Sequence, residues 1–233
     1  MIAQNLASVC QRILVVARDS SRDPDRIRLM AVCKTFPPEV ICEAYHAGQR
    51  LFGENKVQEF AEKAGSLSDL KDAEFHMIGH LQSNKAGKAV ELFNALDSLD
   101  SAKLATRLNA AAEALAKTLP VLIELNIGGE EAKSGVAPDS PELEQILQKA
   151  PEWPHLHIRG LMTVPPYTED PEGARPYFRK LRELRDKLAA RDYPNVSFDE
   201  LSMGMSHDFE VAIEEGSTCV RIGTAIFGER SKP

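Results

Sequence analysis

The sequence of 233 residues has no excess of basic residues, no apolar run of membrane-spanning length and no C-x-x-C spacing. Its formal net charge of −7 leaves no cationic surplus to neutralise the phosphates of nucleic acid or anionic lipid. The first residues lack the charged-then-apolar pattern of a secretory signal. We therefore expect a soluble, cytoplasmic protein with no nucleic-acid partner and no membrane association.

Metal and disulfide signals are equally scarce. The four cysteines, Cys10, Cys33, Cys42 and Cys219, stand in otherwise apolar runs, which favours reduced thiols over disulfides or a zinc site. No pair of histidines has further metal-ligating residues near it in the sequence, so we expect no metal. A G-x-S-x-G elbow is also missing, which argues against a hydrolase triad.

Strand-like apolar segments alternate with helix-like segments along the whole chain. The strand-like segments are 28–34, 51–53, 74–79, 94–99, 120–126, 155–162, 197–202 and 218–222. Eight such repeats predict one α/β domain, residues 1–233, folded as a single (β/α)8 TIM barrel. Too little chain follows the last strand for a regular closing helix. We expect the amphipathic helix of the first eighteen residues to cover the barrel closure instead.

Unusual polar and glycine residues gather where the predicted strands end. They include Lys34 after the first strand, Asn55 after the second, His80 after the third, 203–206 after the seventh and 221–224 at the last. In barrels of this kind the chemistry lies at the carboxyl ends of the strands. Convergence from separate strands is therefore a stronger signal of a site than any one of these motifs.

Lys34 follows an apolar strand, and this position has two interpretations. An ammonium group taken out of water has a lowered pKa and becomes a nucleophile able to form a Schiff base. Alternatively, the lysine simply ends the strand and extends its charge to water.

The segments after strands seven and eight offer donors suited to a phosphate. Gly204, Ser206, Gly223 and Thr224 supply accessible backbone N–H groups and hydroxyls, and a helix predicted over 206–215 would start at Ser206. Ser206 could also be only a helix N-cap, and Gly223 only a turn residue.

Arg221 and the basic residues of 175–187 can each be explained without a ligand. Arg221 lies inside the final strand and needs a partner, and one alternative to a ligand is a buried ion pair with a glutamate such as Glu124. The arginines and lysines of 175–187 are typical of a solvated helix face.

An amine, a phosphate cradle and an arginine at one end of a barrel suit pyridoxal 5′-phosphate bound as a Schiff base. The sequence resembles the pyridoxal phosphate homeostasis proteins, which are similar to the N-terminal barrel of alanine racemase. The matching motifs are AVCKT at 31–35, FGEN at 52–55, HMIGHLQSNK at 76–85, GLM at 160–162, LSMGMS at 201–206 and VRIG at 220–223.

The resemblance implies specific roles. Lys34 would carry the aldehyde of pyridoxal 5′-phosphate, and Arg221 would face the pyridine nitrogen. The phosphate would be held by Ser206, Gly223 and Thr224, and the remaining cofactor-binding residues would be Asn55, His80 and Met203.

Two function classes remain open. The first is a non-catalytic protein that buffers or delivers pyridoxal 5′-phosphate, with apo-enzymes as partners and a monomeric state. The second is an amino-acid racemase of the alanine racemase type. Racemisation needs acid/base groups on both faces of the substrate carbon. None of the tyrosines (Tyr45, Tyr167, Tyr177 and Tyr193) follows a strand within a polar motif, so we favour binding and predict no catalytic residue.

Overall fold

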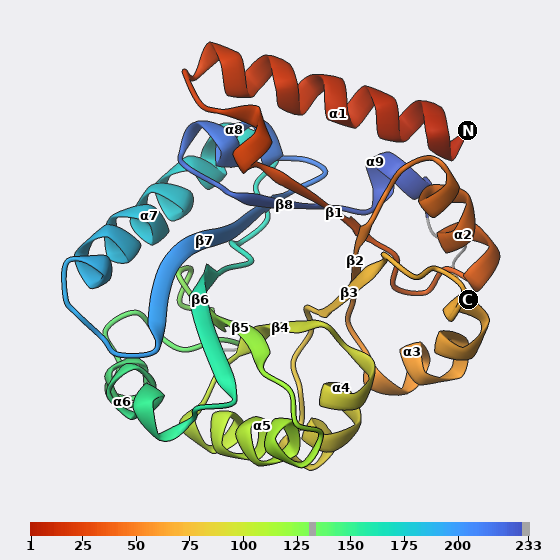
Figure 1. The fold of residues 1–233 in the computed structure, drawn as a ribbon. Helices are drawn as coiled ribbons and strands as arrows, with labels where there is room; N and C mark the ends of the chain where they lie inside the picture. The colour runs from red at the N-terminus through yellow and green to blue at the C-terminus, as the bar shows by residue number, and fades with distance from the viewer. Residues whose placement is uncertain (131–133, 230–233) are drawn as a thin grey trace.

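The computed structural model describes residues 1–130 and 134–229. In these ranges eight parallel strands pair in chain order into a closed barrel, and Ala31 of the first strand lies beside Ile222 of the last. The predicted TIM barrel is confirmed (Figure 1). The strands are β1 (Arg28–Val32), β2 (Leu51–Glu54), β3 (Glu74–Met77), β4 (Ala95–Leu99), β5 (Leu119–Glu124), β6 (Leu156–Met162), β7 (Val196–Met205) and β8 (Cys219–Ile222).

Helices surround this barrel as an outer layer (Figure 1). Their apolar faces and the outward-facing strand residues together form the main hydrophobic core. The helices are α1 (Ile2–Asp19), α2 (Pro38–His46), α3 (Val57–Ala64), α4 (Ala86–Leu92), α5 (Ala102–Ala114), α6 (Pro141–Lys149), α7 (Arg175–Ala189), α8 (Phe209–Glu214) and α9 (Thr224–Phe227).

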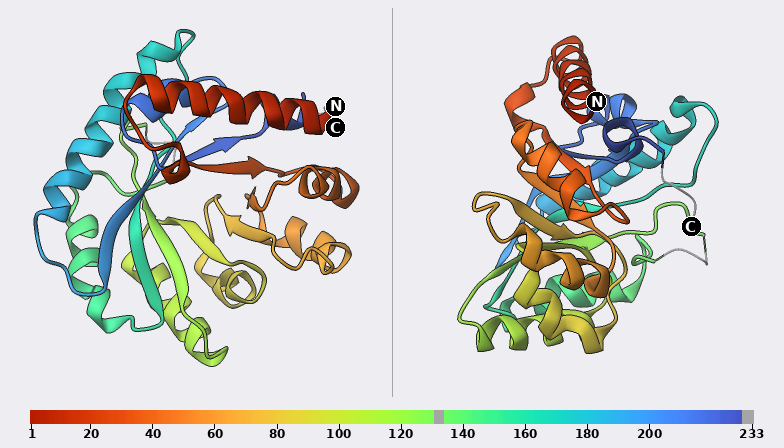
Figure 2. Two further views of the ribbon diagram at one scale, coloured as in Figure 1. Left: turned by 45° about the horizontal axis from the view of Figure 1, so that its top comes forward. Right: turned by 90° about the vertical axis from the view of Figure 1, so that its right-hand side faces the viewer.

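The N-terminal helix α1 covers the closure between β8 and β1, as predicted. It packs against α8, α9 and α2, and the left-hand view of Figure 2 shows it lying across this part of the barrel. Its buried residues recur at three- and four-residue steps, from Ile2 to Ala17. Asn5 also donates from its side chain to the carbonyl of Ile226 at 2.9 Å, which ties α1 to the short α9.

The segment after β7 differs from the prediction. β7 runs for ten residues to Met205, and the helix expected from Ser206 begins only at Phe209. The intervening turn is stabilised by Asp208, whose carboxylate accepts the backbone N–H of Met205 at 2.7 Å. Ser206 is therefore a turn residue and not the start of a helix.

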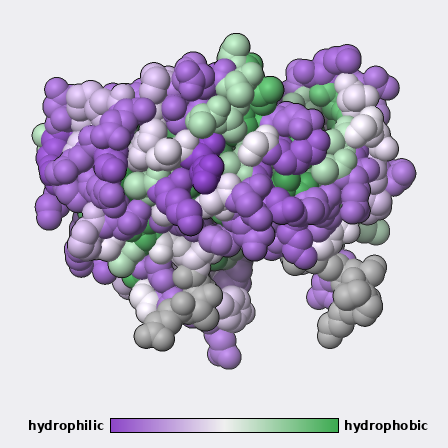
Figure 3. All heavy atoms as spheres, turned by 90° about the horizontal axis from the view of Figure 1, so that it is seen from below, coloured by the Kyte–Doolittle hydropathy of each residue, from purple (hydrophilic) through white to green (hydrophobic). Residues whose placement is uncertain are grey.

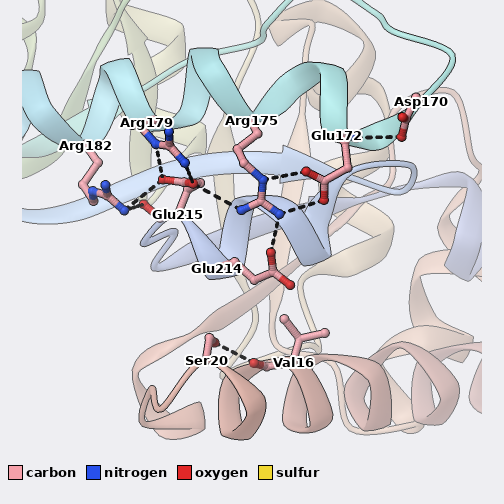
Figure 4. A network of polar contacts seen from close by, with 9 residues as sticks. All are labelled: Val16, Ser20, Asp170, Glu172, Arg175, Arg179, Arg182, Glu214 and Glu215. Carbon is pink, nitrogen blue, oxygen red and sulfur yellow. Dashed lines mark hydrogen bonds and ion pairs between the residues drawn. The ribbon is translucent and has the colours of Figure 1, made fainter.

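The predicted solvated face of α7 is partly wrong. Arg175, Arg179 and Arg182 converge on Glu215 at the end of α8 (Figure 4). The side chain of Glu215 is only 5% exposed, and Arg179 and Arg182 each approach it to 2.9 Å. These arginines tie α7 to α8, a contact between distant segments that the helical charge pattern did not reveal.

Figure 3 shows one face of the molecule, which is mainly hydrophilic. On the face drawn in Figure 3, hydrophobic residues occur in separate groups among hydrophilic ones. Within residues 1–130 and 134–229, no helix has both the length and the apolar character needed to cross a bilayer.

Candidate functional site

A cavity of about 490 Å³ opens at the carboxyl ends of the strands, a size typical of small-molecule sites. The loops after β5 and β6, green and cyan in the right-hand view of Figure 2, project on one side of the barrel. Residues that the sequence predicted from five separate strands meet at this cavity. They are Lys34, Asn55, His80, Ser206, Arg221, Gly223 and Thr224.

Met203 does not line the cavity, so its predicted placement there is wrong. Its side chain is fully buried in the hydrophobic core, while Ser202 contacts Arg221 inside the barrel. Because successive side chains point to opposite faces of a strand, Met203 faces the helices. Met205 lines the cavity instead, because β7 is irregular between Ser202 and Met205, where Gly204 has a φ of 95°, and the alternation is interrupted there.

Lys34 lies in a tight turn two residues beyond the end of β1. The residue after it, Thr35, has a φ of 70°, and its N–H donates to Glu59 of α3 at 2.5 Å. Lys34 is half-buried at the cavity wall, so it is not fully taken out of water as the first of its two interpretations supposed. The turn therefore presents this amine to the cavity.

Among the described residues, the buried lysine is Lys63 of α3, which the sequence analysis missed. Its ammonium donates to the carbonyls of Cys33 at 3.4 Å and Phe36 at 3.1 Å, on either side of Lys34. It also pairs at 2.7 Å with Glu54, whose side chain is 0% exposed. Lys63 thus attaches the Lys34 turn to both α3 and β2.

The carboxyl group of Glu54 is buried, and one of its oxygens accepts two hydrogen bonds. Its Oε1 accepts from Lys63 and from the thiol of Cys33, at 3.1 Å. Burial raises the pKa of Glu54, while the bonds from Lys63 and Cys33 oppose that shift. A glutamate directly after the strand-like segment 51–53 was the only sequence signal for this pair.

The predicted phosphate cradle lies between β7 and β8. The hydroxyl oxygen of Ser206 accepts the N–H of Gly223 at 3.3 Å and that of Ala225 at 3.4 Å. Thr224 begins α9, so the helix start at this site belongs to α9 and not to a helix from Ser206. Hydroxyl and backbone N–H donors gathered in this way suit an anion.

Gly204 was also predicted to contribute to the phosphate cradle, but here it is required for the packing of β7 against α8. Its φ is 95°, and a Cβ at this position would lie 2.5 Å from the Cβ of Ala212 in α8. Only glycine allows β7 and α8 to approach this closely.

Arg221 is almost completely buried and aimed at the cavity from β8. Its guanidinium donates to the Ser202 hydroxyl and to the Thr163 carbonyl, both at 2.7 Å. Burial lowers its pKa, and nearby acidic groups oppose the shift. In the described part of the chain Arg221 and Glu124 form no hydrogen bond or ion pair, so the alternative of a direct pair is wrong.

Glu124, at the end of β5, is a site residue that the sequence analysis considered only as that partner. It is 7% exposed and lines the cavity, and its Oε2 has no hydrogen-bond partner among the described residues. Burial raises the pKa of Glu124 to about 7; Asp100 adds to the shift, while Arg221 and His80 oppose it.

Two further polar groups face the same space. His80 is paired through Nδ1 with Asp100 at 2.8 Å, and the Oδ1 atom of Asn55 is buried without a partner in residues 1–130 and 134–229. Buried polar atoms are normally satisfied. The oxygens of Asn55 and Glu124 that lack partners in the described residues therefore indicate that the cavity binds a polar ligand.

The opposite mouth of the barrel is closed by charge pairs. A smaller cavity there, of about 170 Å³, includes His76, Arg28 and Glu200 in its wall. His76 bonds through Nδ1 to Asp97 at 3.0 Å. Burial opposes its charge, but Asp97 and Glu74 outweigh burial and raise the pKa of His76 to about 9. His76 therefore has a structural environment, inside the network of charge pairs at this mouth.

Comparison with known proteins gives a consistent picture. Residues 5–231 match the family described as alanine racemase, N-terminal domain. The chain is 49% identical to the pyridoxal phosphate homeostasis protein of Aquifex aeolicus over 97% of both chains. It is 43% identical to the protein of that name from Escherichia coli, over 98% of this chain and 97% of the other.

The chain is also similar to solved structures. PipY of Synechococcus elongatus, solved with PLP bound, is 37% identical and has a TM-score of 0.84, with 98% of this chain and 100% of PipY covered. Alanine racemase of Clostridium difficile has a TM-score of 0.68 at 11% identity, with 96% of this chain but 57% of the racemase covered. The likeness to the racemase shows a shared fold alone.

Proposed function

The chain belongs to the alanine racemase N-terminal domain family, among the pyridoxal phosphate homeostasis proteins, and from this membership we propose that it binds pyridoxal 5′-phosphate and serves its homeostasis. Its role is to buffer or deliver the cofactor. Apo-enzymes that use the cofactor are the partners it would supply. The structure of its relative PipY with PLP bound supports the choice of this ligand.

The observation that carries this proposal is the shared cavity of an amine and a phosphate cradle. Lys34 follows β1, and Gly223 and Thr224 follow β8, which pairs directly with β1. The two functional ends of the ligand can therefore be bound from neighbouring strands. When bound, pyridoxal 5′-phosphate supplies an aldehyde, and we assign its covalent attachment to Lys34.

The remaining residues position the ligand. Ser206, Gly223 and Thr224 would hold the phosphate through hydroxyl and backbone donors. Arg221, which stays charged, would face the pyridine nitrogen and keep it an unprotonated acceptor. Asn55 and His80 would line the pocket near the ring.

We infer binding without turnover. Arg221 disfavours a protonated ring, which weakens the stabilisation of a carbanion by the cofactor. Within the described residues, no tyrosine lines the cavity to act as the opposite acid/base group. We also propose one domain over residues 1–233 acting as a cytoplasmic monomer, since a closed barrel has no free strand edge.

Absorption spectroscopy tests the ligand and its attachment. Purified protein mixed with pyridoxal 5′-phosphate should gain a visible absorption band that borohydride fixes to the chain. Lys34→Ala should abolish both the band and the fixed adduct, whereas Lys88→Ala, at an exposed lysine of α4, should retain them. Peptide mapping that finds the fixed adduct away from Lys34, or no band in the unaltered protein, would refute the proposal.

Chiral analysis tests the absence of turnover. Loaded protein incubated with L-alanine should leave the amino acid unchanged. Inversion that disappears in Lys34→Ala would instead make the protein a racemase.

A further inference from the structure

Glu124 lies across the barrel mouth from Lys34. In a ring of eight strands β5 is the fourth neighbour of β1, so the ends of these two strands are opposite each other. Both residues line the same cavity. A ligand attached to Lys34 and extending over the mouth would therefore approach Glu124.

The carboxyl group of Glu124 is shielded from solvent by the returning segment 134–136. The N–H of Val136 donates to the backbone carbonyl of Glu124 at 2.8 Å, and a Cβ on Gly135 would lie 3.2 Å from the Glu124 Cγ. Only 7% of the residue is exposed. Shielding of this kind disfavours an ionised carboxylate, particularly one with an oxygen that has no donor.

Charged groups from three directions act on this carboxyl group. Asp100, which follows β4, favours the neutral acid. His80, which follows β3, and Arg221 on β8 favour the carboxylate. Their opposition, together with burial, places the pKa of Glu124 at about 7, so its charge changes within the physiological range.

We propose that Glu124 is a further ligand-binding residue, which enters the complex as the neutral acid and donates a hydrogen bond from its carboxyl group to an acceptor atom of the ligand. This inference rests on the proposed function, because it takes the ligand to be a phosphate-bearing pyridoxal compound. Such a ligand brings negative charge into the cavity, and an ionised Glu124 would add repulsion. The neutral acid removes this repulsion and supplies the donor.

Proton uptake on binding is the direct consequence. Below a pH of about 7 Glu124 already holds its proton, while above it each complex must take one from solvent. If the complex holds the proton throughout, the dissociation constant should rise about tenfold between pH 6 and pH 8 through this residue.

The test uses pyridoxine 5′-phosphate, which has an alcohol in place of the aldehyde and cannot bond covalently to Lys34. Titration calorimetry at pH 6, 7 and 8, in two buffers of different ionisation enthalpy, measures affinity and proton uptake together. Glu124→Gln keeps a hydrogen-bond donor of similar size but cannot titrate. Glu91→Gln, at an exposed carboxylate of α4, is the matched control.

Wild-type protein and Glu91→Gln should show the tenfold weakening and net proton uptake at pH 8. In Glu124→Gln both should be reduced, with affinity retained at high pH. The ligand phosphate is common to the titrations of all three proteins, so its contribution cancels in the comparison. Equal pH dependence in Glu124→Gln and the wild type would overturn the inference while leaving the proposed function intact.

Failure of the unaltered protein to bind any pyridoxal compound would instead overturn the proposed function, and this inference with it. If Glu124→Gln does not fold, infrared difference spectra of the wild type provide a second test. Adding the ligand at pH 8 should produce a new band of a protonated carboxyl group. Absence of that band would overturn the inference.

Discussion

Replacing Lys63 by methionine tests whether the buried pair with Glu54 supports the Lys34 turn. The substitution keeps an unbranched side chain but removes the ammonium that bonds Glu54 at 2.7 Å and the Phe36 carbonyl at 3.1 Å. Glu54, with 0% exposure, would be left as an acid whose other oxygen already lacks a partner in the described residues.

The expected loss follows from this burial. Removing one partner of a buried ion pair costs about 3–5 kcal/mol, against a total stability of about 5–15 kcal/mol for a typical domain. Lys63→Met should therefore remain folded at 25 °C, with its urea midpoint lowered by about 1–2 M.

The loss should also depend on pH. Without Lys63, the pKa of Glu54 in the folded protein is raised further above its unfolded value, because burial is no longer opposed by the ammonium. A raised folded pKa contributes stability at low pH that is lost as pH rises through it. The deficit of Lys63→Met relative to wild type should thus be smaller at pH 5 than at pH 8.

Urea unfolding at both pH values, followed by circular dichroism, measures these deficits. The double variant Glu54→Met with Lys63→Met should be more stable than the single variant, because no buried acid remains unpaired. Loading with pyridoxal 5′-phosphate should stay weak in both variants, since the Cys33 and Phe36 carbonyls have lost their donor. Lys88→Met, at an exposed lysine, controls for the loss of a charge.

A deficit below about 1 kcal/mol, or one that is equal at pH 5 and pH 8, would refute the assignment of a buried ion pair. Normal loading of the double variant would refute the positioning role of Lys63 while leaving the stability argument intact.

Two further predictions concern the opposite mouth and the β7–α8 contact. The pKa of His76 is raised to about 9, so its charge contributes stability below its unfolded value of 6.5 that is lost as pH rises through 9. Wild-type protein should lose up to about 3 kcal/mol of unfolding free energy between pH 7 and pH 10, and Asp97→Asn should flatten this profile in urea titrations. Gly204→Ala should lower the melting temperature, because its Cβ would meet that of Ala212 at 2.5 Å. Gly87→Ala, where nothing lies within 4 Å of the added Cβ, should leave the melting temperature unchanged or slightly raised, and equal effects of the two alanines would contradict the packing argument.

The barrel could be predicted from the sequence because its signals are local. Apolar segments such as 120–126 alternate with helical periodicities such as that of the first eighteen residues, and each segment's type depends on its own residues. Lys34, Ser206 and Arg221 could be assigned to one mouth for the same reason, since every parallel strand brings its carboxyl end to the same side.

The facing and burial of individual side chains were decided only by the tertiary structure. Met203 and Met205 are two residues apart and would share one face of a regular strand, but β7 is irregular between Ser202 and Met205, where Gly204 has a φ of 95°. The first methionine therefore lies in the core and the second at the cavity. Whether Ser206 began a helix likewise depended on how Asp208 bonded back to Met205.

By itself, the order of residues determined the eight-stranded barrel and the end at which its polar groups gather. Tertiary structure decided that Lys63 is the enclosed lysine and that Glu124 holds an unpaired oxygen beside the cavity. The physical reason is that burial and charge depend on neighbours distant in the chain, such as Asp100 and Arg221 around Glu124. A local sequence pattern cannot predict those neighbours.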